Sequence, residues 1–233
     1  MSLFFNWSPD AYEYIPTSLG YVLMTAVLII AFLLILAVHK NNSKKMSAKE
    51  LAFCAMAMAL AVIASFIKLT SLPFGGSVTL FSMFFICLVG YVYGANVGIL
   101  AGVAYGFLQL VIQPYIYHPI QVLLDYPLAF GALGLSGIFA KKQNGLVKGY
   151  LLGVLGRYIM HVISGYVFFA SYAPEGMNPM IYTLGYNLTY ILPEAVATTA
   201  ILFVPAVANG IRIVRNTVYS DQENDAGLKT VIR

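Results

Sequence analysis

Long apolar blocks follow one another along most of this chain. A helical membrane span needs roughly 20 mostly apolar residues, whereas the strands of a membrane barrel would show alternation over segments of ~10 residues. The pattern predicts seven spans, at about residues 18–38, 50–69, 78–94, 96–113, 119–140, 147–171 and 180–214. Pro193 and Pro205 lie in the last block, so we expect a kink there.

Composition supports an all-α integral membrane protein. The 233 residues are 60% hydrophobic and 9% charged, whereas a soluble domain carries about 25% charge. Cys54 and Cys87 both lie within apolar blocks, and we expect no disulfide between them. The chain shows no Cys or Cys/His spacing typical of a metal site, so no metal and no cofactor are predicted.

Lysines and arginines gather in alternate loops. Four follow the first span, three separate the fifth from the sixth, and four follow the last, which makes eleven of the 13 basic residues. Loops rich in Lys and Arg face the cytoplasm. The N-terminus is therefore expected outside the cell and the C-terminus inside, in a multi-pass protein of the cell membrane.

Three parts are predicted along the chain. Residues 1–45 form an N-terminal extension that contains the extra first span. Because the segment before that span has no basic residue, it does not resemble a secretory signal, and Met46 could itself open the next part. Residues 46–215 form a six-helix membrane unit, and the polar residues 216–233 form a disordered cytoplasmic tail.

Ionisable residues inside the spans are the strongest functional candidates, because each costs ~2.5–3.5 kcal/mol on insertion scales. Counting 1.5 Å per residue places Asp125, Asn187 and His161 roughly 9–15 Å from the outer end of their spans. The same count places Arg157 and Glu194 deeper, both at roughly 21 Å. We interpret these two as a structural ion pair between neighbouring helices, with a proton relay or gate as the alternative.

The outer polar layer has the chemistry of a binding site. Interhelical hydrogen bonding would explain any one of these residues, at ~0.6 kcal/mol on average, but the three together favour a site. A carboxylate attracts a cation, an amide offers a donor and an acceptor, and the tyrosines and phenylalanines nearby suit flat or cationic rings. We therefore expect a flat, nitrogen-rich, positively charged ligand that enters from outside.

Motifs of the commonest energy-coupled and hydrolytic chemistries are absent. The chain has no phosphate-binding GxxxxGK(S/T) loop, no HExxH and no GxSxG, so we expect neither ATP hydrolysis by this chain nor enzyme activity. Two stripes of small residues predict close helix contacts. One contains Ala55 and Ala59, four apart, and the other contains glycines at residues 94, 98, 102 and 106.

Residues 72–139, which begin LPFGGSVTLF and include YHPIQVLLDYPLAFG, closely resemble the thiamine-specific substrate-binding (S) component of energy-coupling factor transporters. The resemblance covers about residues 48–214. It implies a six-helix bundle that binds thiamine from outside, plus the one extra N-terminal helix. It also implies import when the chain pairs with a transmembrane coupling protein and two cytosolic ATPases, which would use the ATP.

The resemblance also implies roles for particular residues. Asp125 takes the place of a Glu found in some members, and Phe169 takes the place of a Trp. A second family Trp aligns near Gly76, and the only Trp here is Trp7, so ring stacking falls to other aromatic residues, with Phe74 among them. The implied ligand-binding residues are Tyr115, Asp125, Tyr126, His161, Phe169, Tyr182 and Asn187, and the implied partner-binding residues are Ala55 and Ala59.

Three alternative functions stay open at this point. The chain could be an S component for a related small molecule, such as a thiamine precursor. It could be a membrane-embedded enzyme that uses His161 and Glu194. It could also be a stand-alone carrier coupled to protons through Arg157 and Glu194, although no internal repeat typical of many carriers is visible.

Overall fold

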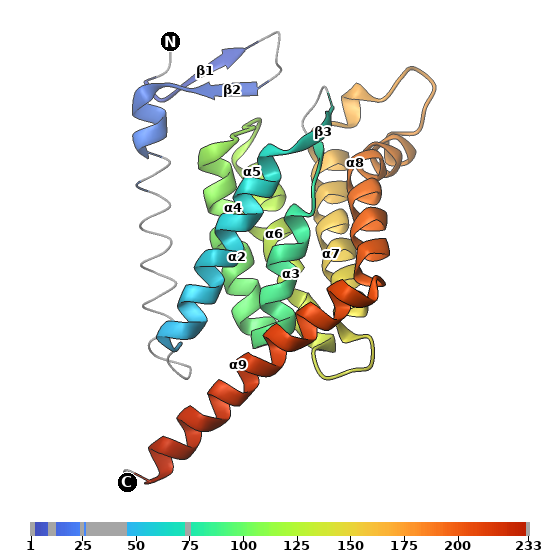
Figure 1. Ribbon diagram of the computed structural model, residues 1–233. Helices are drawn as coiled ribbons and strands as arrows, with labels where there is room; N and C mark the ends of the chain where they lie inside the picture. Colours follow the sequence, from blue (N-terminus) through green and yellow to red (C-terminus); the bar gives the residue numbers. More distant parts are fainter. Residues whose placement is uncertain (1–2, 9–12, 24–25, 27–45, 73–75, 232–233) are drawn as a thin grey trace.

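The computed structural model describes residues 3–8, 13–23, 26, 46–72 and 76–231. Four helical segments are long and apolar enough to cross a membrane, namely α2 (Ala48–Phe66), α4 (Ala95–Ile112), the segment Pro119–Phe139 and α7 (Gly145–Phe168). They pack side by side in one bundle (Figure 1). The predicted fold class, a helical membrane protein, is confirmed for these residues. The predicted first span falls largely on residues 24–25 and 27–45, outside the described residues.

The ends of two predicted spans differ from the sequence pattern. Within the apolar block 78–94, the helix α3 (Ser82–Tyr93) has only 12 residues, which corresponds to roughly 18 Å and is shorter by itself than a ~30 Å hydrocarbon core. The last block forms α8 (Pro179–Leu202) and α9 (Pro205–Val231), which are bent by 83°. Pro205 begins α9, where its missing N–H is tolerated.

Residues 216–220, predicted as part of a disordered tail, continue α9 instead, and the helix runs on to Val231. This helix leaves the bundle at the end opposite the β-strands (Figure 1). Its mean hydropathy is low beyond the apolar part, and glutamate, lysine and alanine in the tail are compatible with a helix. The polar composition did not reveal that this segment is helical.

Two short antiparallel hairpins interrupt the helical pattern. The first joins β1 (Phe5–Ser8) to β2 (Glu13–Pro16), and the second joins β3 (Lys68–Ser71) to β4 (Ser77–Thr79). Both lie at the same end of the bundle (Figure 1). Strands of three or four residues carry too little periodicity to be recognised in a sequence.

The segment Pro119–Phe139 is not one regular helix. It consists of α5 (Pro119–Leu123), the π-helical turn η1 (Leu124–Leu128), α6 (Ala129–Leu133) and the 3-10 helix η2 (Gly134–Phe139). Pro127 lies inside η1. Because proline has no N–H and crowds the preceding turn, a π turn accommodates it where a regular α-helix would be strained.

Three glycines of α4 bring this helix against the irregular segment. A Cβ atom on Gly102 would lie 2.3 Å from the carbonyl oxygen of Phe130, and one on Gly106 would lie 2.6 Å from that of Tyr126. A Cβ atom on Gly98 would lie 2.9 Å from the carbonyl oxygen of Gly134. The predicted close helix contact is therefore confirmed, whereas Gly94, with φ of 93°, joins α3 to α4.

Candidate functional site

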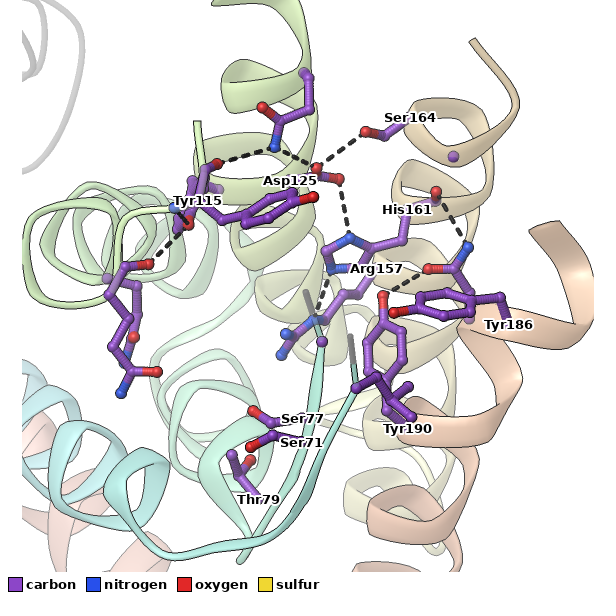
Figure 2. Close-up of a pocket in the computed structure, with 18 of the residues that line it drawn as sticks. Ser71, Ser77, Thr79, Tyr115, Asp125, Arg157, His161, Ser164, Tyr186 and Tyr190 are labelled. Carbon is purple, nitrogen blue, oxygen red and sulfur yellow. Dashed lines mark hydrogen bonds and ion pairs between the residues drawn. The ribbon is translucent and has the colours of Figure 1, made fainter. Parts of the chain in front are cut away.

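A cavity of about 370 Å³ opens among β3, β4, α4, η1, α7 and α8. Its size is within the range of small-molecule sites, about 300–1,000 Å³. All seven residues predicted to bind the ligand line it, and so does Arg157. Figure 2 shows Asp125, His161 and Arg157 among them. These are Tyr115, Asp125, Tyr126, His161, Phe169, Tyr182 and Asn187.

The carboxylate of Asp125 is held by three neighbours. Its Oδ2 atom accepts hydrogen bonds from Gln121 Nε2 at 2.7 Å and from Ser164 Oγ at 3.0 Å, and its Oδ1 atom lies 3.0 Å from His161 Nδ1. The side chain is 16% exposed. A carboxylate has about four acceptor positions, so these contacts orient Asp125 and leave room for one more donor.

His161 connects Asp125 to Arg157. Arg157 Nε donates to His161 Nε2 at 3.2 Å, one helical turn away along α7. The guanidinium carbon lies 4.3 Å from the ring centroid of Phe130, a cation–π contact. Arg157 is therefore part of the same polar cluster as Asp125, although counting residues along the span placed it deeper.

Asn187 lies on the facing helix α8, and its amide is fully oriented. Its Nδ2 atom donates to the carbonyl oxygens of Thr183, at 2.9 Å, and of His161, at 3.4 Å. Its Oδ1 atom accepts a hydrogen bond from the Tyr190 hydroxyl. Gly165 allows this close approach of α7 to α8, since a Cβ atom there would lie 2.6 Å from Thr183 Cγ2. The predicted outer layer of Asp125, His161 and Asn187 thus comes together in space.

Aromatic rings form two walls of the cavity. Tyr182, Tyr186 and Tyr190 follow one another at every fourth position of α8, with centroids 5.8 and 6.2 Å apart. Phe169 and Tyr172 stack at 5.8 Å on the other side, at the end of α7. Tyr172 follows the polar and aromatic stripe that the sequence predicts on the sixth span. Tyr186 extends the predicted set, and its four-residue spacing from Tyr182 was the signal for it.

Tyr126 holds the loop that carries Tyr115. Its hydroxyl accepts from the backbone N–H of Tyr115 at 2.7 Å and donates to the carbonyl of Gln113 at 2.8 Å. Gln121 ties the same loop, because its Nε2 atom donates to the carbonyl of Tyr115 at 3.2 Å as well as to Asp125. Tyr126 therefore lines the cavity, and its hydroxyl holds the loop of Gln113 and Tyr115 in place.

The prediction of an ion pair between Arg157 and Glu194 is wrong. Both side chains are described, and they are not within salt-bridge distance of each other. Glu194 instead accepts hydrogen bonds from Thr79 Oγ1 at 2.6 Å, Ser82 Oγ at 3.3 Å and the backbone N–H of Met83 at 2.9 Å. Met83 lies in the first turn of α3, which has no side-chain cap of its own. A carboxylate is stabilised at such a helix N-terminus, so Glu194 caps α3 from α8.

A second polar group lines the cavity away from Asp125, on the β3–β4 hairpin. Ser71, Ser77 and Thr79 form it, as Figure 2 shows, and Lys68 lies on the same hairpin. The sequence pattern did not identify these residues: Lys68 and Thr79 fall at the ends of predicted apolar spans, and no element was predicted for Ser71 and Ser77 between those spans. It also did not identify Gln109 and Gln113 of the α4 end, which line the cavity too. Phe74 falls outside the described residues.

Two further expectations concern metals and the alanine stripe. Within the described ranges, no group of three or more His, Cys, Asp or Glu residues is placed to hold a metal ion.

On α2, Ala55 and Ala59 are exposed, whereas Ala57 and Ala61 are buried in the bundle. The Ala55/Ala59 face is therefore not covered by the described part of the chain.

Comparison with known proteins shows the family of the chain. A family model described as thiamine transporter protein matches residues 51–213. Thiamine transporter ThiT of Bacillus subtilis (strain 168) is 38% identical over 178 residues, covering 70% of this chain and 91% of that protein. Thiamine transporter ThiT of Lacticaseibacillus paracasei is 32% identical over 121 residues, covering 45% of this chain and 60% of that protein.

A solved structure shares the fold. The structure of ThiT from Listeria monocytogenes superposes with a TM-score of 0.55 at 24% identity, covering 67% of this chain and 94% of that one. The family match extends from α2 into α9 and includes every residue that lines the cavity. The chain belongs to the thiamine transporter family.

Proposed function

We propose that this chain captures thiamine in the cavity around Asp125. The observation that carries the proposal is the convergence of one oriented carboxylate, one oriented amide and two aromatic walls in a cavity of about 370 Å³. Two relatives named thiamine transporters support the same ligand. The family is one of transporters rather than enzymes, which removes the membrane-embedded enzyme from the alternatives.

The chemistry of thiamine matches the two kinds of surface. Its thiazolium ring carries a positive charge, which the negative Asp125 and the tyrosine faces of α8 favour. Its aminopyrimidine is flat and offers donors and acceptors. The remaining acceptor position of Asp125 suits the amino group. The second polar group, with Ser71 and Ser77, offers hydroxyls to the hydroxyethyl end of the ligand.

Import follows from assembly with a coupling protein and two cytosolic ATPases. No phosphate-binding loop occurs in this chain, so ATP must be used by other subunits. The exposed Ala55/Ala59 face of α2 supports a helix-docking surface, because small residues let a second helix approach closely. The proposed orientation has the N-terminus outside and the C-terminus in the cytoplasm, which places both hairpins at the extracellular end.

Uptake into vesicles tests the coupled mechanism. We expect radiolabelled thiamine to accumulate only when this chain, the coupling protein, both ATPases and internal ATP are present. Accumulation by this chain alone, driven by a proton gradient, would instead support the stand-alone carrier.

Competition between ligand fragments tests the identity of the ligand. Unlabelled thiamine should displace bound radiolabelled thiamine at far lower concentration than either the pyrimidine or the thiazole half does, because each half reaches only part of the cavity. If one half competed as well as thiamine, a precursor would be the better candidate ligand.

A further inference from the structure

Arg157 is a charged residue of the cavity that the proposed function leaves without a role. It lies on α7 and lines the cavity. In the described part of the chain, its guanidinium has no carboxylate within salt-bridge distance, and the carboxylate of Asp125 contacts His161 instead. Its contacts are instead the ring of Phe130, 4.3 Å from the guanidinium carbon, and His161 Nε2, 3.2 Å from its Nε atom.

The direction of these hydrogen bonds assigns the protons on His161. Arginine has only donors, so His161 Nε2 must accept and carries no proton. The proton of the imidazole is then on Nδ1, which lies 3.0 Å from Asp125 Oδ1 and donates to it. Arg157, His161 and Asp125 therefore form one directed chain that runs from α7 to η1.

Among the described residues, no group other than Arg157 donates a hydrogen bond to His161 Nε2. The ring of Tyr190 meets its face edge-on at 6.0 Å, and Asn187 contacts its backbone carbonyl rather than its ring. Arg157 thus makes Nε2 the acceptor nitrogen of His161, which leaves Nδ1 as the nitrogen that donates to Asp125.

We infer that Arg157 is a positioning residue for ligand binding, which acts through His161 to hold the carboxylate of Asp125 in its binding orientation. The inference rests on the proposed function. Gln121 and Ser164 hold Oδ2, and His161 holds Oδ1. Loss of the arginine removes the donor to His161 Nε2, so the imidazole, and with it the contact to Oδ1, is no longer held in one orientation. The cation–π contact holds the guanidinium against the ring of Phe130 on α6.

A double-mutant cycle tests whether Arg157 acts through His161. Arg157→Met should weaken thiamine binding at least about tenfold in the otherwise intact full-length protein, and less than about twofold in a His161→Ala background. Arg157→Lys keeps a donor that can reach the same ring nitrogen, so it should stay within about threefold of the wild type. Arg212→Met, the same substitution at an exposed position of α9, should not change affinity.

Equal weakening by Arg157→Met in both backgrounds would overturn the inference, because it would show direct contact with the ligand or a general effect on the fold. Unchanged affinity in Arg157→Met would overturn it as well.

A second measurement does not need the ligand. The chain has three histidines, so ¹⁵N-histidine NMR of the ligand-free protein resolves His161 by comparison with His161→Ala. We expect the Nε2 signal of His161 to shift in Arg157→Met, and an unchanged signal would contradict the assigned hydrogen bond. If the wild type failed to bind thiamine while this shift occurred, the proposed ligand would be wrong and the link between Arg157 and His161 would stand.

Discussion

Asp125→Asn removes the negative charge of the cavity with almost no change in shape. In the structure this carboxylate accepts from Gln121 and Ser164 and faces His161, with a side chain that is only 16% exposed. A hydrogen bond to a charged group contributes roughly 1.5–3 kcal/mol, and unit charges about 4 Å apart interact by about 4 kcal/mol at an effective dielectric constant of 20. Thiamine affinity should therefore fall at least tenfold, and at most about 1,000-fold.

Titration calorimetry of the purified full-length variants measures this loss directly. Asp125→Glu keeps the negative charge and adds one methylene group, so it should bind within about tenfold of the wild type. Glu175→Gln removes an exposed carboxylate that does not line the cavity, and it should leave affinity unchanged. Melting curves without ligand confirm that each variant is folded. Wild-type affinity in Asp125→Asn would refute the assignment of Asp125 as the cation-binding group.

Three other substitutions test the surroundings of the site. Asn187→Ala should weaken thiamine binding at least about tenfold in the same calorimetric assay, since a buried amide that orients two helices is lost; affinity within twofold of the wild type would contradict this. Glu194→Gln should lower the free energy of unfolding by about 1–3 kcal/mol in denaturant titrations, because α3 loses its charged cap; unchanged stability would contradict the capping role. Tyr14→Pro removes the backbone N–H that donates to the carbonyl of Ile116 at 2.7 Å. Hydrogen exchange of the backbone amides in the loop around Ile116 should therefore accelerate. Tyr14→Ala keeps that N–H, so the same amides should exchange at the wild-type rate.

The outer layer of the site was predictable because its residues are costly in a membrane. Asp125, His161 and Asn187 each interrupt an apolar helix at a similar depth, and a bundle has few places where such side chains can meet. The glycines of α4 were equally informative, since a backbone contact as close as that between Gly102 and Phe130 leaves no room for a side chain.

Arg157 and Glu194 show what counting along a helix leaves out. Depth was assigned from the backbone, but the long side chain of Arg157 reaches one turn outward to His161. The four-residue spacing of Arg157 and His161 already placed these two residues on one face of the helix. Glu194 is satisfied chiefly by the first turn of α3 and by two hydroxyls before it, and no sequence pattern shows which helix end a carboxylate from another helix will cap.

The cavity residues of the β3–β4 hairpin could not be predicted from the periodicity of the sequence. Ser71 and Ser77 belong to strands of four and three residues, and their position depends on Gly76, which has φ of 85° and packs against Tyr190. The π turn at Pro127 is similar, because the proline signals an irregularity but not which kind of turn absorbs it. Both features shape the cavity, and both are tertiary in origin.

Calorimetric titration of the detergent-purified full-length chain with thiamine tests most directly whether the cavity around Asp125 is a thiamine site. We expect saturable binding of one thiamine per chain by the wild-type protein and a loss of at least about tenfold in Asp125→Asn. No heat of binding from a folded wild-type protein, or equal binding by both proteins, would contradict the proposed site.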